Sequence, residues 1–492
     1  MKLIKLLQEL NISIDDYPNA CRIDIKGIKS NSKFVEQGDL FVAINGYEVD
    51  GHGFIKDAVD SGAVAILGES DYQSTEIPYI RVKDSRKTLA KLVSCFYGYP
   101  YKKHIMIGIT GTNGKTTTAY MLKHILELQG KTCSLIGTVN TIINNEVIQS
   151  KNTTPDSIEL NQLIAKSDDD VVIMEVSSHG IEQNRIEGIY FDFAIFTNLS
   201  HDHMDYHKDM WDYFQVKARL FNQLKPTGQA IIATYTDWGK KLADKLTTSK
   251  TLLFTIGIGE NSLIVEEILP SYFSEFKYNI DGNSYRIKCT TPGVHNGWNM
   301  MTAILTCNRM GYNIDSIHNS LQSFSGVPGR FETFTHHNGA SFVIDYAHTA
   351  DAIKYCLEIA EREHAEQIIH VLGFRGKRDV TKRDAMIDSS KEFSHLIILT
   401  LDDLNGEEEK DMICSLNELK ERFLDYPIVV IPDRTQAISF AWRKVNGTKD
   451  WVFITGKGPE RYEQVYELPC SSDKETIMYL LSKANHNKCI LP

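Results

Sequence analysis

A glycine-rich segment, Thr110-Gly-Thr-Asn-Gly-Lys-Thr-Thr117, contains the residue types that bind nucleotide phosphates. Gly111 and Gly114 allow backbone N–H groups to approach anionic oxygens, and Lys115 adds a full positive charge. The Thr116 hydroxyl can hold Mg²⁺, and the N-terminus of a following helix adds partial positive charge. Isoleucine replaces the first glycine of the common G-x4-G-K-[ST] pattern, which leaves a simple tight turn as the alternative. The lysine and the threonines favour a phosphate site.

The residues on either side predict the strand and the helix that position this loop. The run Ile105-Met-Ile-Gly-Ile109 is continuously apolar, which is typical of a buried parallel strand. From Thr118 to Gln129, apolar residues recur at helical spacing. Three further apolar runs predict strands of the same parallel sheet: Asp170–Glu175, Phe193–Thr197 and Gln229–Ala233.

Four apolar runs nearer the C-terminus predict a second open α/β sheet. They are Phe342–Asp345, Ile368–Leu372, Leu396–Thr400 and Val452–Thr455. Between them, residues 352–361 and 435–444 have helical periodicity. Ligands of such sheets bind beyond the carboxyl ends of the strands. The segments that follow these ends are Tyr346-Ala-His, Gly373-Phe-Arg, Leu401-Asp-Asp and Gly456-Lys-Gly.

The length of 492 residues predicts two to four domains, and the sequence pattern separates three blocks. Residues 1–103 mix short strand-like runs, such as 39–43 and 63–67, with turn residues. Residues 104–328 contain the phosphate loop and its sheet, and residues 329–492 contain the second sheet. A Gly-Val-Pro-Gly turn separates these last two blocks.

Composition excludes several classes of protein. A content of 42% hydrophobic and 24% charged residues is typical of a soluble globular protein. The net charge of −11 argues against nucleic-acid binding, and no apolar run reaches the length of a membrane span. The nine cysteines form no C-x-x-C pair, so neither a disulfide framework nor a zinc site is expected. The chain also starts without the features of a secretory signal, so we expect a cytoplasmic protein.

Six segments in colinear order resemble the Mur ligase family, ATP-dependent ligases that build the peptidoglycan precursor peptide. Within the family the resemblance is to the MurE type, which adds the third amino acid to UDP-N-acetylmuramoyl-dipeptide. The segments are 110–117, Asn152-Thr-Thr-Pro155, Met174-Glu-Val-Ser-Ser-His-Gly180, Thr197-Asn-Leu-Ser-His-Asp-His-Met-Asp-Tyr-His207, Val327-Pro-Gly-Arg-Phe-Glu332 and Asp345-Tyr-Ala-His-Thr349.

The resemblance implies an α/β fold with three domains. These are a small N-terminal α/β UDP-binding domain (1–103), a central P-loop-type parallel-sheet ATPase domain (104–328) and a C-terminal Rossmann-like α/β domain that binds the amino acid (329–492). The resemblance also implies a monomer that uses ATP and Mg²⁺. Its two other substrates would be a UDP-muramoyl-peptide and a free amino acid.

The chemistry of the family explains why such residues are needed. A carboxylate does not acylate an amine at neutral pH, because its leaving group would be an oxide. The family transfers the ATP γ-phosphoryl group to the carboxylate, and the amine then attacks the acyl phosphate and displaces phosphate. Phosphoryl transfer depends on positioning and on charge neutralisation, so cations must surround the γ-phosphate.

The resemblance assigns roles to individual residues of the ATP site. The ATP-binding positions are Gly111, Thr112, Asn113, Gly114, Lys115, Thr116, Thr117, Asn296, Arg330 and Asp345. The catalytic positions are Lys115, Glu175, His203 and Lys217. Mg²⁺ would be held by Thr116, Glu175, His203 and Lys217, the last as a carbamate formed with CO₂. Taken singly, a glutamate at a strand end or one histidine is more often an ordinary surface residue or a satisfied hydrogen bonder. A lone lysine in a helical stretch, such as Lys217, is usually solvated.

The substrate positions are assigned in the same way. Those for the UDP substrate are Ser32, Asn152, Thr153, Thr154, Ser177, Gln183 and Arg185. Hydroxyls and amides suit sugar and pyrophosphate oxygens, and an arginine offers a bidentate fork to an anion. Those for the amino acid are Arg378, Asp402, Asp403, Asn405, Gly456 and Glu460. The alternative for the serine and threonine residues is that they only cap helices or form turns.

The segment that selects the amino acid departs from the family pattern. Asn405 stands where diaminopimelate-adding members have an arginine that contacts the distal carboxylate, and losing such a contact costs about 2–5 kcal/mol. Diaminopimelate is therefore disfavoured. Asp402, Asp403 and Glu460 would instead form an acidic pocket for the ω-ammonium of lysine or ornithine. The alternative is that the two aspartates cap the following helix and face water.

Other departures keep two further hypotheses open. They are Asn31 and Lys33 beside Ser32, His201, Ala350, Arg375 and Pro459. One hypothesis is a Mur-like ligase that couples an amino acid to a different small-molecule carboxylate in a secondary pathway. The other is a non-catalytic nucleotide-binding module, which predicts that catalytic residues are lost; none is lost.

Overall fold

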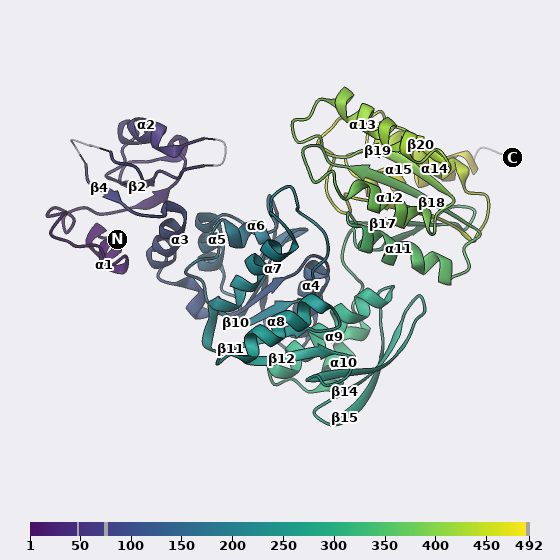
Figure 1. Cartoon of the computed structure of the whole chain (residues 1–492), viewed down its shortest axis with the longest axis horizontal. Coiled ribbons are helices and arrows are strands. Elements are labelled where there is room, and N and C mark those ends of the chain that lie inside the picture. The colour runs from purple at the N-terminus through teal and green to yellow at the C-terminus, as the bar shows by residue number, and fades with distance from the viewer. Residues whose placement is uncertain (47–48, 73–76, 489–492) are drawn as a thin grey trace. The chain divides into compact units, whose positions relative to one another are not determined.

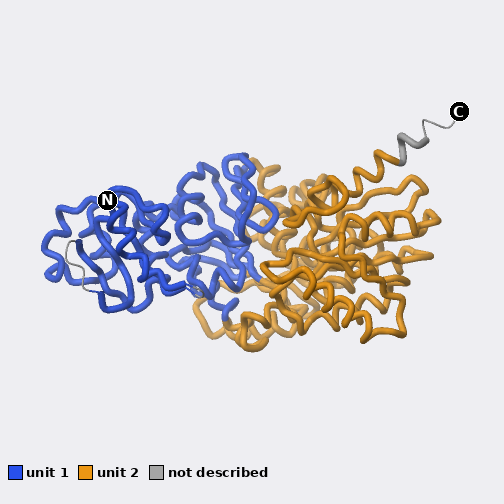
Figure 2. Tube along the Cα trace, turned by 90° about the horizontal axis from the view of Figure 1, so that it is seen from above, with its two compact units in different colours: residues 1–110, 131–195, 216–230 blue, residues 111–130, 196–215, 231–492 orange. Residues whose placement is uncertain are grey.

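The computed structural model describes residues 1–46, 49–72 and 77–488 (Figure 1). By internal contacts the chain divides into two compact units (Figure 2). Unit 1 comprises Met1–Thr110, Lys131–Ile195 and Val216–Ala230, and unit 2 comprises Gly111–Gly130, Phe196–Gln215 and the chain from Ile231 onward. Within the described residues the principal strands form three sheets, of four, eleven and six strands.

The N-terminal sheet is entirely parallel. Its strands, in spatial order, are β1 (Gly27–Lys29), β2 (Asp39–Val42), β3 (Ala65–Gly68) and β4 (Tyr79–Arg81). The helices of this block are α1 (Leu3–Glu9), α2 (Ile55–Asp60) and α3 (Ser85–Phe96), with short 3₁₀ helices η1 (Ser32–Phe34), η2 (Gly51–Phe54) and η3 (Pro100–Lys103). Both strands predicted for this block are confirmed, as β2 and β3. Every residue of these two strands is buried.

The central sheet has the strand order β15-β14-β13-β12-β11-β10-β5-β9-β6-β7-β8. Its strands are β5 (Ile105–Thr110), β6 (Cys133–Ile136), β7 (Asn140–Ile143), β8 (Glu146–Gln149), β9 (Val171–Glu175), β10 (Phe191–Phe196), β11 (Leu224–Ala233), β12 (Leu252–Gly257), β13 (Leu263–Leu269), β14 (Glu275–Ile280) and β15 (Asn283–Lys288). Its helices are α4 (Lys115–Leu128), α5 (Ser157–Lys166), α6 (Ser178–Glu182), α7 (Met210–Ala218), α8 (Asp237–Thr247), α9 (Val294–Arg309) and α10 (Ile314–Gln322), with η4 (Arg219–Gln223).

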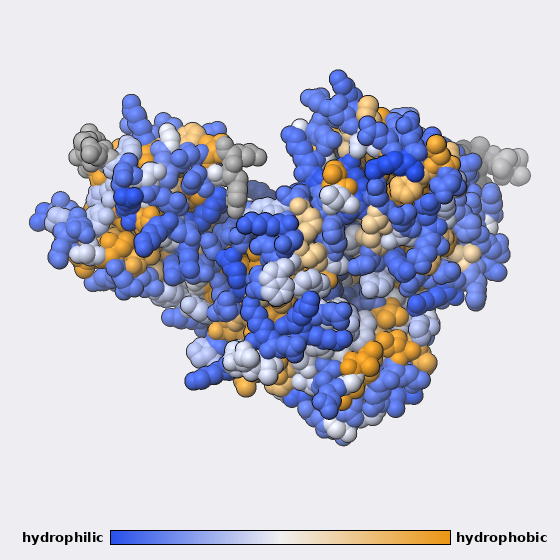
Figure 3. Space-filling view, viewed as in Figure 1, coloured by the Kyte–Doolittle hydropathy of each residue, from blue (hydrophilic) through white to orange (hydrophobic). Residues whose placement is uncertain are grey.

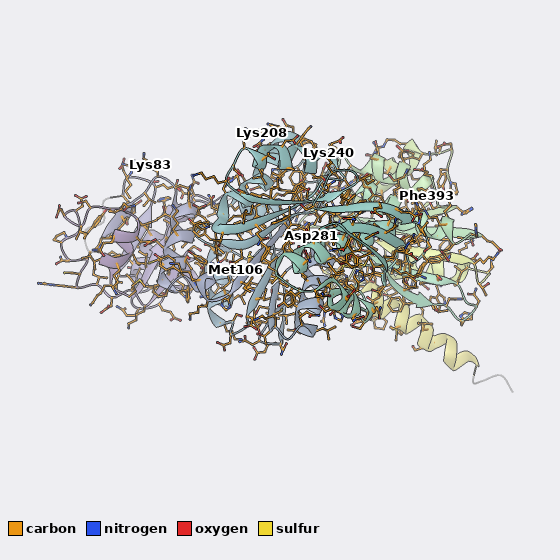
Figure 4. All side chains as sticks on the ribbon, turned by 90° about the horizontal axis from the view of Figure 1, so that it is seen from below. Lys83, Met106, Lys208, Lys240, Asp281 and Phe393 are labelled. Carbon is orange, nitrogen blue, oxygen red and sulfur yellow. The ribbon has the colours of Figure 1, made fainter. Side chains whose placement is uncertain are left out.

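All four predicted strands are present, as β5, β9, β10 and β11, and the antiparallel extensions of the sheet were not predicted. β5, β9 and β6 run parallel, and Ile109 of β5 is paired with Glu175 of β9. The antiparallel pairs are β6 with β7, β7 with β8, β13 with β14 and β14 with β15. Asp281 and Gly282 turn β14 into β15 with φ of +51° and +83° (Asp281 is labelled in Figure 4). An Asp-Gly pair with both φ values positive matches the type I′ hairpin, whose twist suits the flanking strands.

The C-terminal sheet has the order β16-β17-β21-β18-β19-β20, and only its edge strand β16 is antiparallel to its neighbour. Its strands are β16 (Glu332–Thr335), β17 (Ser341–Asp345), β18 (Gln367–Phe374), β19 (Leu396–Leu401), β20 (Ile428–Val430) and β21 (Asp450–Thr455). Its helices are α11 (Ala350–Arg362), α12 (Arg383–Lys391), α13 (Glu409–Arg422), α14 (Arg434–Lys444) and α15 (Asp473–Lys488). The four strands and two helices predicted here are confirmed.

Helices cover both faces of the C-terminal sheet. Alternate residues of a strand enter different cores: Val343 packs with α11, α12 and α13, whereas Phe342 and Ile344 pack with α14 and α15. Two buried faces explain why these strands are continuously apolar rather than alternating. The molecular face drawn in Figure 3 is mainly hydrophilic. Among the described residues, no helix combines the length and the apolarity that spanning a bilayer requires.

A fully buried ion pair joins α14 to α15. The Arg434 guanidinium donates from Nε and Nη2 to the two carboxylate oxygens of Asp473 at 2.7 and 2.8 Å, and from Nη2 to the Thr455 carbonyl at 3.0 Å. Both side chains are 0% exposed. The pair therefore fixes these two helices at the carboxyl end of β21.

We expect Asp473→Asn to lower the free energy of unfolding of the C-terminal block by about 3–5 kcal/mol, because it leaves a buried guanidinium without its counter-charge. Urea unfolding followed by tryptophan fluorescence measures this change. Asp425→Asn is the matched control, since Asp425 is exposed and pairs with Lys391 across 3.4 Å at the surface. Equal unfolding free energies for the two variants would contradict the assigned role of the buried pair.

Candidate active site

The glycine-rich loop begins where β5 ends, and α4 begins directly after it. Gly111 and Gly114 have φ of +146° and +84°, and Gly114 is the N-cap of α4. A Cβ atom on Gly111 would lie 2.0 Å from Thr197 Oγ1, and one on Gly114 would lie 2.2 Å from Asn299 Oδ1. The backbone therefore approaches its neighbours too closely for any side chain, as a phosphate-binding loop requires.

Hydrogen bonds hold the loop against the segment that follows β10. The Asn113 N–H donates to Asn198 Oδ1 at 2.8 Å, and the Asn113 carbonyl accepts from Thr197 Oγ1 at 2.6 Å and from Asn198 Nδ2 at 3.0 Å. Lys115 Nζ donates to the carbonyls of Gly111 and Thr112, each at 2.9 Å. The ammonium thus lies over the loop, where an anionic phosphate would neutralise it.

We expect Gly114→Ala to weaken ATP binding about 100-fold, because the new methyl group meets Asn299 and alanine strongly disfavours a φ of +84°. Isothermal titration with a non-hydrolysable ATP analogue measures the affinity. Gly130→Ala is the control, since Gly130 also has a positive φ of +83° but a methyl group there would meet nothing within 4 Å. An unchanged affinity in Gly114→Ala would contradict the assignment of the loop.

Three other predicted ATP residues lie in the same unit as the loop. Arg330 Nη2 donates to Thr116 Oγ1 at 3.2 Å, and its guanidinium lies 4.3 Å from the centre of the Tyr346 ring. Asn299 Nδ2 donates to Asn296 Oδ1 at 3.3 Å, which links Asn296 to the side chain beside Gly114. The structure therefore brings Arg330 and Asn296 together with the loop.

Asp345 has a supporting position. Its carboxylate is almost fully buried and accepts from the backbone N–H groups of Phe331 and Ala347, both at 2.7 Å. Phe331 has a left-handed φ of +49° and follows Arg330 directly. Asp345 therefore fixes the backbone turn that aims Arg330 at the loop.

Glu175, at the end of β9, has a fully buried carboxylate. Its Oε1 accepts from the Thr138 N–H at 2.9 Å, and its Oε2 accepts from Thr138 Oγ1 at 3.0 Å. Thr138 also contacts Thr153 Oγ1 at 3.1 Å. Sequence reasoning did not identify Thr138, which lies 37 residues from Glu175 along the chain. Ile109 of β5 is paired with Glu175 of β9 and is the second residue before Gly111.

Four of the residues predicted to bind the UDP substrate form one cluster. Thr154 Oγ1 lies 3.2 Å from Ser177 Oγ, and the Thr154 carbonyl accepts from Arg185 Nη1 at 2.6 Å. Arg185 also donates from Nε and Nη2 to Gln183 Oε1 at 3.1 and 2.8 Å. Ser177 caps α6, since its hydroxyl accepts from the Gly180 N–H at 3.0 Å, so the capping interpretation is correct for this serine.

The remaining UDP-site residues are less constrained. Asn152 is exposed and Thr153 is half-buried. Ser32 opens η1, which is capped by Asn31 through a hydrogen bond from the Lys33 N–H at 3.1 Å. The structure thus gives Asn31 a local role in shaping the turn that carries Ser32.

The segment after β10 carries His203 beside a buried carboxylate. His203 has a left-handed φ of +58°, and its Nε2 lies 3.4 Å from Asp202 Oδ2. Asp202 also pairs with His348 Nε2 at 3.4 Å and with Lys382 Nζ at 2.7 Å. Burial alone would raise the pKa of Asp202, but the neighbouring histidines and Lys382 hold it well below its usual value. Asp202 is therefore a carboxylate at neutral pH.

Lys217 lies in α7 and is only 2% exposed, so it is not the solvated helix lysine of the alternative interpretation. A buried ammonium is costly, and conversion to a carbamate would replace it with an oxygen ligand. Hydroxyl and carboxylate oxygens suit Mg²⁺, so the donor types of Thr116, Glu175 and a carbamylated lysine fit that ion. No group of three or more His, Cys, Asp and Glu side chains within the described residues is arranged to hold a metal.

The four predicted catalytic side chains are divided between the two units. Lys115 and His203 belong to unit 2, and Glu175 and Lys217 belong to unit 1. Their convergence on one nucleotide, and with it the composition of the Mg²⁺ site, stays a prediction.

The acidic residues predicted for the amino-acid pocket are already paired with cations. Lys457 Nζ lies 3.2 Å from Asp402 Oδ1 and 2.5 Å from Asp403 Oδ1. Arg375 forms an ion pair with Glu460 and lies 3.6 Å from Asp402 Oδ2. Burial raises the pKa of Asp402, but Arg375 and Lys457 outweigh it and hold the pKa at about 2. The expectation of an open acidic pocket for an ω-ammonium is therefore wrong.

The alternative role for these aspartates is also wrong. Asp402 and Asp403 are 1% and 7% exposed, so neither faces water. The next helix, α13, begins at Glu409, with Glu408 as its N-cap. The two aspartates are thus internal partners of Lys457 rather than helix caps.

The guanidinium in this cluster belongs to Arg375, whereas the predicted Arg378 is exposed. Asn405 is turned inward and donates from Nδ2 to the carbonyls of Gly376 at 3.0 Å and Asp403 at 3.3 Å. Gly456, at the end of β21, has a φ of +105°, and a Cβ there would lie 3.1 Å from Asp402 Oδ2. The structure therefore brings together segments 375–376, 402–405 and 456–460. They follow β18, β19 and β21, and the prediction was that these strands end at the same edge of the sheet.

Three family models match successive parts of the chain. They describe a Mur ligase family catalytic domain over residues 24–97, a Mur ligase middle domain over 109–307, and a Mur ligase, glutamate ligase domain over 329–458. The match of all three models agrees with a three-domain α/β protein. The individual domain boundaries stay a prediction.

Similar proteins share the full length of the chain. A UDP-N-acetylmuramoyl-L-alanyl-D-glutamate–2,6-diaminopimelate ligase of Clostridioides difficile (strain 630) is 36% identical, with 98% of this chain and 100% of the relative covered. A protein of the same name from Clostridium botulinum (strain ATCC 19397 / Type A) is also 36% identical, with 94% and 95% covered. A solved structure of a ligase of that name has a TM-score of 0.67 at 24% identity and covers 98% of this chain and 99% of its own. That structural likeness supports the fold.

Proposed function

Because the chain belongs to the Mur ligase family, whose members are ATP-dependent ligases that form C–N bonds, we propose that it adds the third amino acid to UDP-N-acetylmuramoyl-L-alanyl-D-glutamate in peptidoglycan biosynthesis. The observation that carries this proposal is the glycine loop at the end of β5, joined to Arg330 through Thr116. It supplies the phosphate cradle and a second cation that the ATP-dependent half of the reaction needs.

In the proposed mechanism the γ-phosphoryl group of ATP moves to the free carboxylate of the UDP substrate. Lys115 and Arg330 neutralise the charge on the transferred group, and the loop N–H groups orient it. The amine of the incoming amino acid then forms the C–N bond, and the C–O bond to phosphate breaks. The cluster of Thr154, Ser177, Gln183 and Arg185 would hold the UDP substrate and fix its orientation.

Mg²⁺, when bound, would add charge neutralisation at the phosphates, held by Thr116, Glu175, His203 and Lys217. Lys217 contributes an oxygen ligand only as a carbamate, in which its neutral Nζ bonds to the carbon of CO₂ and one proton leaves. Burial of this lysine supports the assignment, because a carbamate replaces a buried ammonium with an oxygen ligand. The monomeric state and the cytoplasmic location remain parts of the proposal.

The incoming amino acid that we propose is 2,6-diaminopimelate, for which the relatives are named. Asn405 disfavoured this amino acid in the sequence, because that position lacks the arginine of diaminopimelate-adding members. Arg375, directly after β18, supports the new assignment, because its five N–H donors allow it to bind the distal carboxylate while it stays paired with Glu460 and Asp402. The neutralised aspartates also remove the reason to favour lysine.

Arg375→Gly is therefore expected to lower kcat/KM for diaminopimelate by about 30-fold or more, because a charge-assisted contact to the distal carboxylate is lost. The KM for ATP should change less than about twofold. Steady-state kinetics with diaminopimelate and with lysine measure both effects, and Arg422→Gln, which removes an exposed arginine paired with Asp384, is the control. A variant that retains its full diaminopimelate activity would refute the role of Arg375.

A phosphate-release assay tests the proposed function as a whole. We expect phosphate release to require ATP, UDP-N-acetylmuramoyl-L-alanyl-D-glutamate and one amino acid of a panel that includes diaminopimelate, lysine and ornithine. If no amino acid elicits release with this acceptor, the proposed acceptor is wrong. Release with another carboxylate would then support a ligase of a secondary pathway, which Asn31 and Lys33 beside Ser32 favour.

A further inference from the structure

The buried carboxylate of Asp202 gathers three basic groups from two distant parts of the chain. His203 is its neighbour in sequence, whereas His348 follows β17 and Lys382 is the residue before α12. The Asp202 side chain is 3% exposed, and the ion pair to Lys382 Nζ is 2.7 Å long. The ion pair with Lys382 therefore compensates a buried charge that would be costly without a partner.

A second buried carboxylate links the segments around residues 202 and 382, and this one belongs to the segment around residue 382. Asp379, itself buried, accepts from the Met204 N–H at 3.3 Å and lies 4.0 Å from His201 Nδ1. Its other oxygen accepts from the Thr381 N–H at 2.9 Å, which shapes its own loop. Each segment, 201–204 and 379–382, thus contains one buried aspartate that contacts the other segment. We call these two segments the paired loops.

Each of the paired loops carries or adjoins a residue assigned to the reaction. His203 lies between Asp202 and Met204, and its left-handed φ of +58° is a conformation that a histidine adopts only when the surrounding structure imposes it. Arg378 directly precedes Asp379 and belongs to the positions predicted for the amino acid. A displacement of the 379–382 loop would therefore remove the Lys382–Asp202 ion pair and the Met204–Asp379 hydrogen bond, which lie on either side of His203 in the sequence.

We propose that Asp202 is a positioning residue. Its ion pair with Lys382 couples the position of the 379–382 loop to the position of His203. The role of the coupling in catalysis rests on the proposed function, but the coupling itself is a property of the protein alone. The coupling predicts that a substitution at position 382 changes the local stability of residues 201–207. His203 would reach its working position only when the 379–382 loop is seated.

Hydrogen exchange of the full-length protein without ligands tests the coupling. In Lys382→Met we expect amides of residues 201–207 to exchange at least about tenfold faster than in the wild type. Lys391→Met removes a surface cation from the other end of α12 and should leave them unchanged, and Lys382→Arg should restore protection. Unchanged exchange at 201–207 in a folded Lys382→Met variant would overturn the proposal, whether or not the proposed substrates are correct.

Kinetics then separate positioning from simple structural support. Asp202→Asn should lower kcat about 100-fold because His203 is misplaced, while the affinity for ADP stays within about threefold of the wild type. Asp205→Asn is the control, because Asp205 is exposed in the same segment. If the pair acts as a unit, the double variant Asp202→Asn/Lys382→Met loses no more than the worse single variant. Losses that multiply would show two independent effects and refute the coupling.

Discussion

Lys115→Met is expected to lower kcat for phosphate release about 1,000-fold. The ammonium lies over the loop, 2.9 Å from the carbonyls of Gly111 and Thr112, and supplies the positive charge of the segment assigned to the phosphates. Methionine keeps most of the side-chain volume, so the loop should fold while losing the charge that stabilises phosphoryl transfer. Single-turnover phosphate release measures the change.

A matched substitution controls for the loss of one positive charge. Lys131 lies just beyond α4 and is 39% exposed, with Asp170 at 3.8 Å. Lys131→Met should keep activity within about twofold of the wild type. If Lys115→Met also retained such activity, the loop would not be the site of ATP chemistry.

Lys217→Ala is expected to abolish turnover while leaving nucleotide affinity within about threefold. The reason is that Lys217 is assigned to an oxygen ligand of Mg²⁺, formed with CO₂, rather than to the phosphate cradle. Alanine also leaves a cavity at a buried site, so Lys217→Met is the companion variant that keeps the volume without the reactive amine. Calorimetric nucleotide binding and phosphate release, measured on both variants, separate the two effects.

The wild-type protein offers an independent check of the carbamate. Activity should fall in buffers stripped of CO₂ and return when bicarbonate is added, whereas Lys217→Met should respond to neither. Normal turnover in either Lys217 variant would refute the carbamate role. Full wild-type activity without CO₂ would refute it as well.

The sequence predicted the strands of the parallel cores because each strand can be identified from its own apolar composition. β5, β9 and β18 are mainly apolar and almost wholly buried, as is typical of parallel strands that are covered on both faces. The phosphate loop was equally readable, since its glycines are required by close contacts that recur wherever backbone cradles an anion. The strand ends then indicated which segments meet.

Other features depended on contacts that no local pattern contains. The pairing of Lys457 with Asp402 and Asp403 joins residues more than 50 positions apart, and it changed the expected pocket from acidic to neutralised. The contact of Thr138 with Glu175 is equally non-local. The hairpin of β14 and β15, by contrast, was signalled by its Asp-Gly turn between alternating apolar residues and could have been predicted.

The most direct test of the central claim, activation of a carboxylate as an acyl phosphate, follows oxygen atoms. The acceptor UDP-N-acetylmuramoyl-L-alanyl-D-glutamate is prepared with ¹⁸O in the carboxylate that reacts, and the released phosphate is analysed by mass spectrometry. An acyl phosphate predicts that one ¹⁸O atom enters phosphate for each amide bond formed. Unlabelled phosphate, or ¹⁸O found in AMP instead, would contradict it.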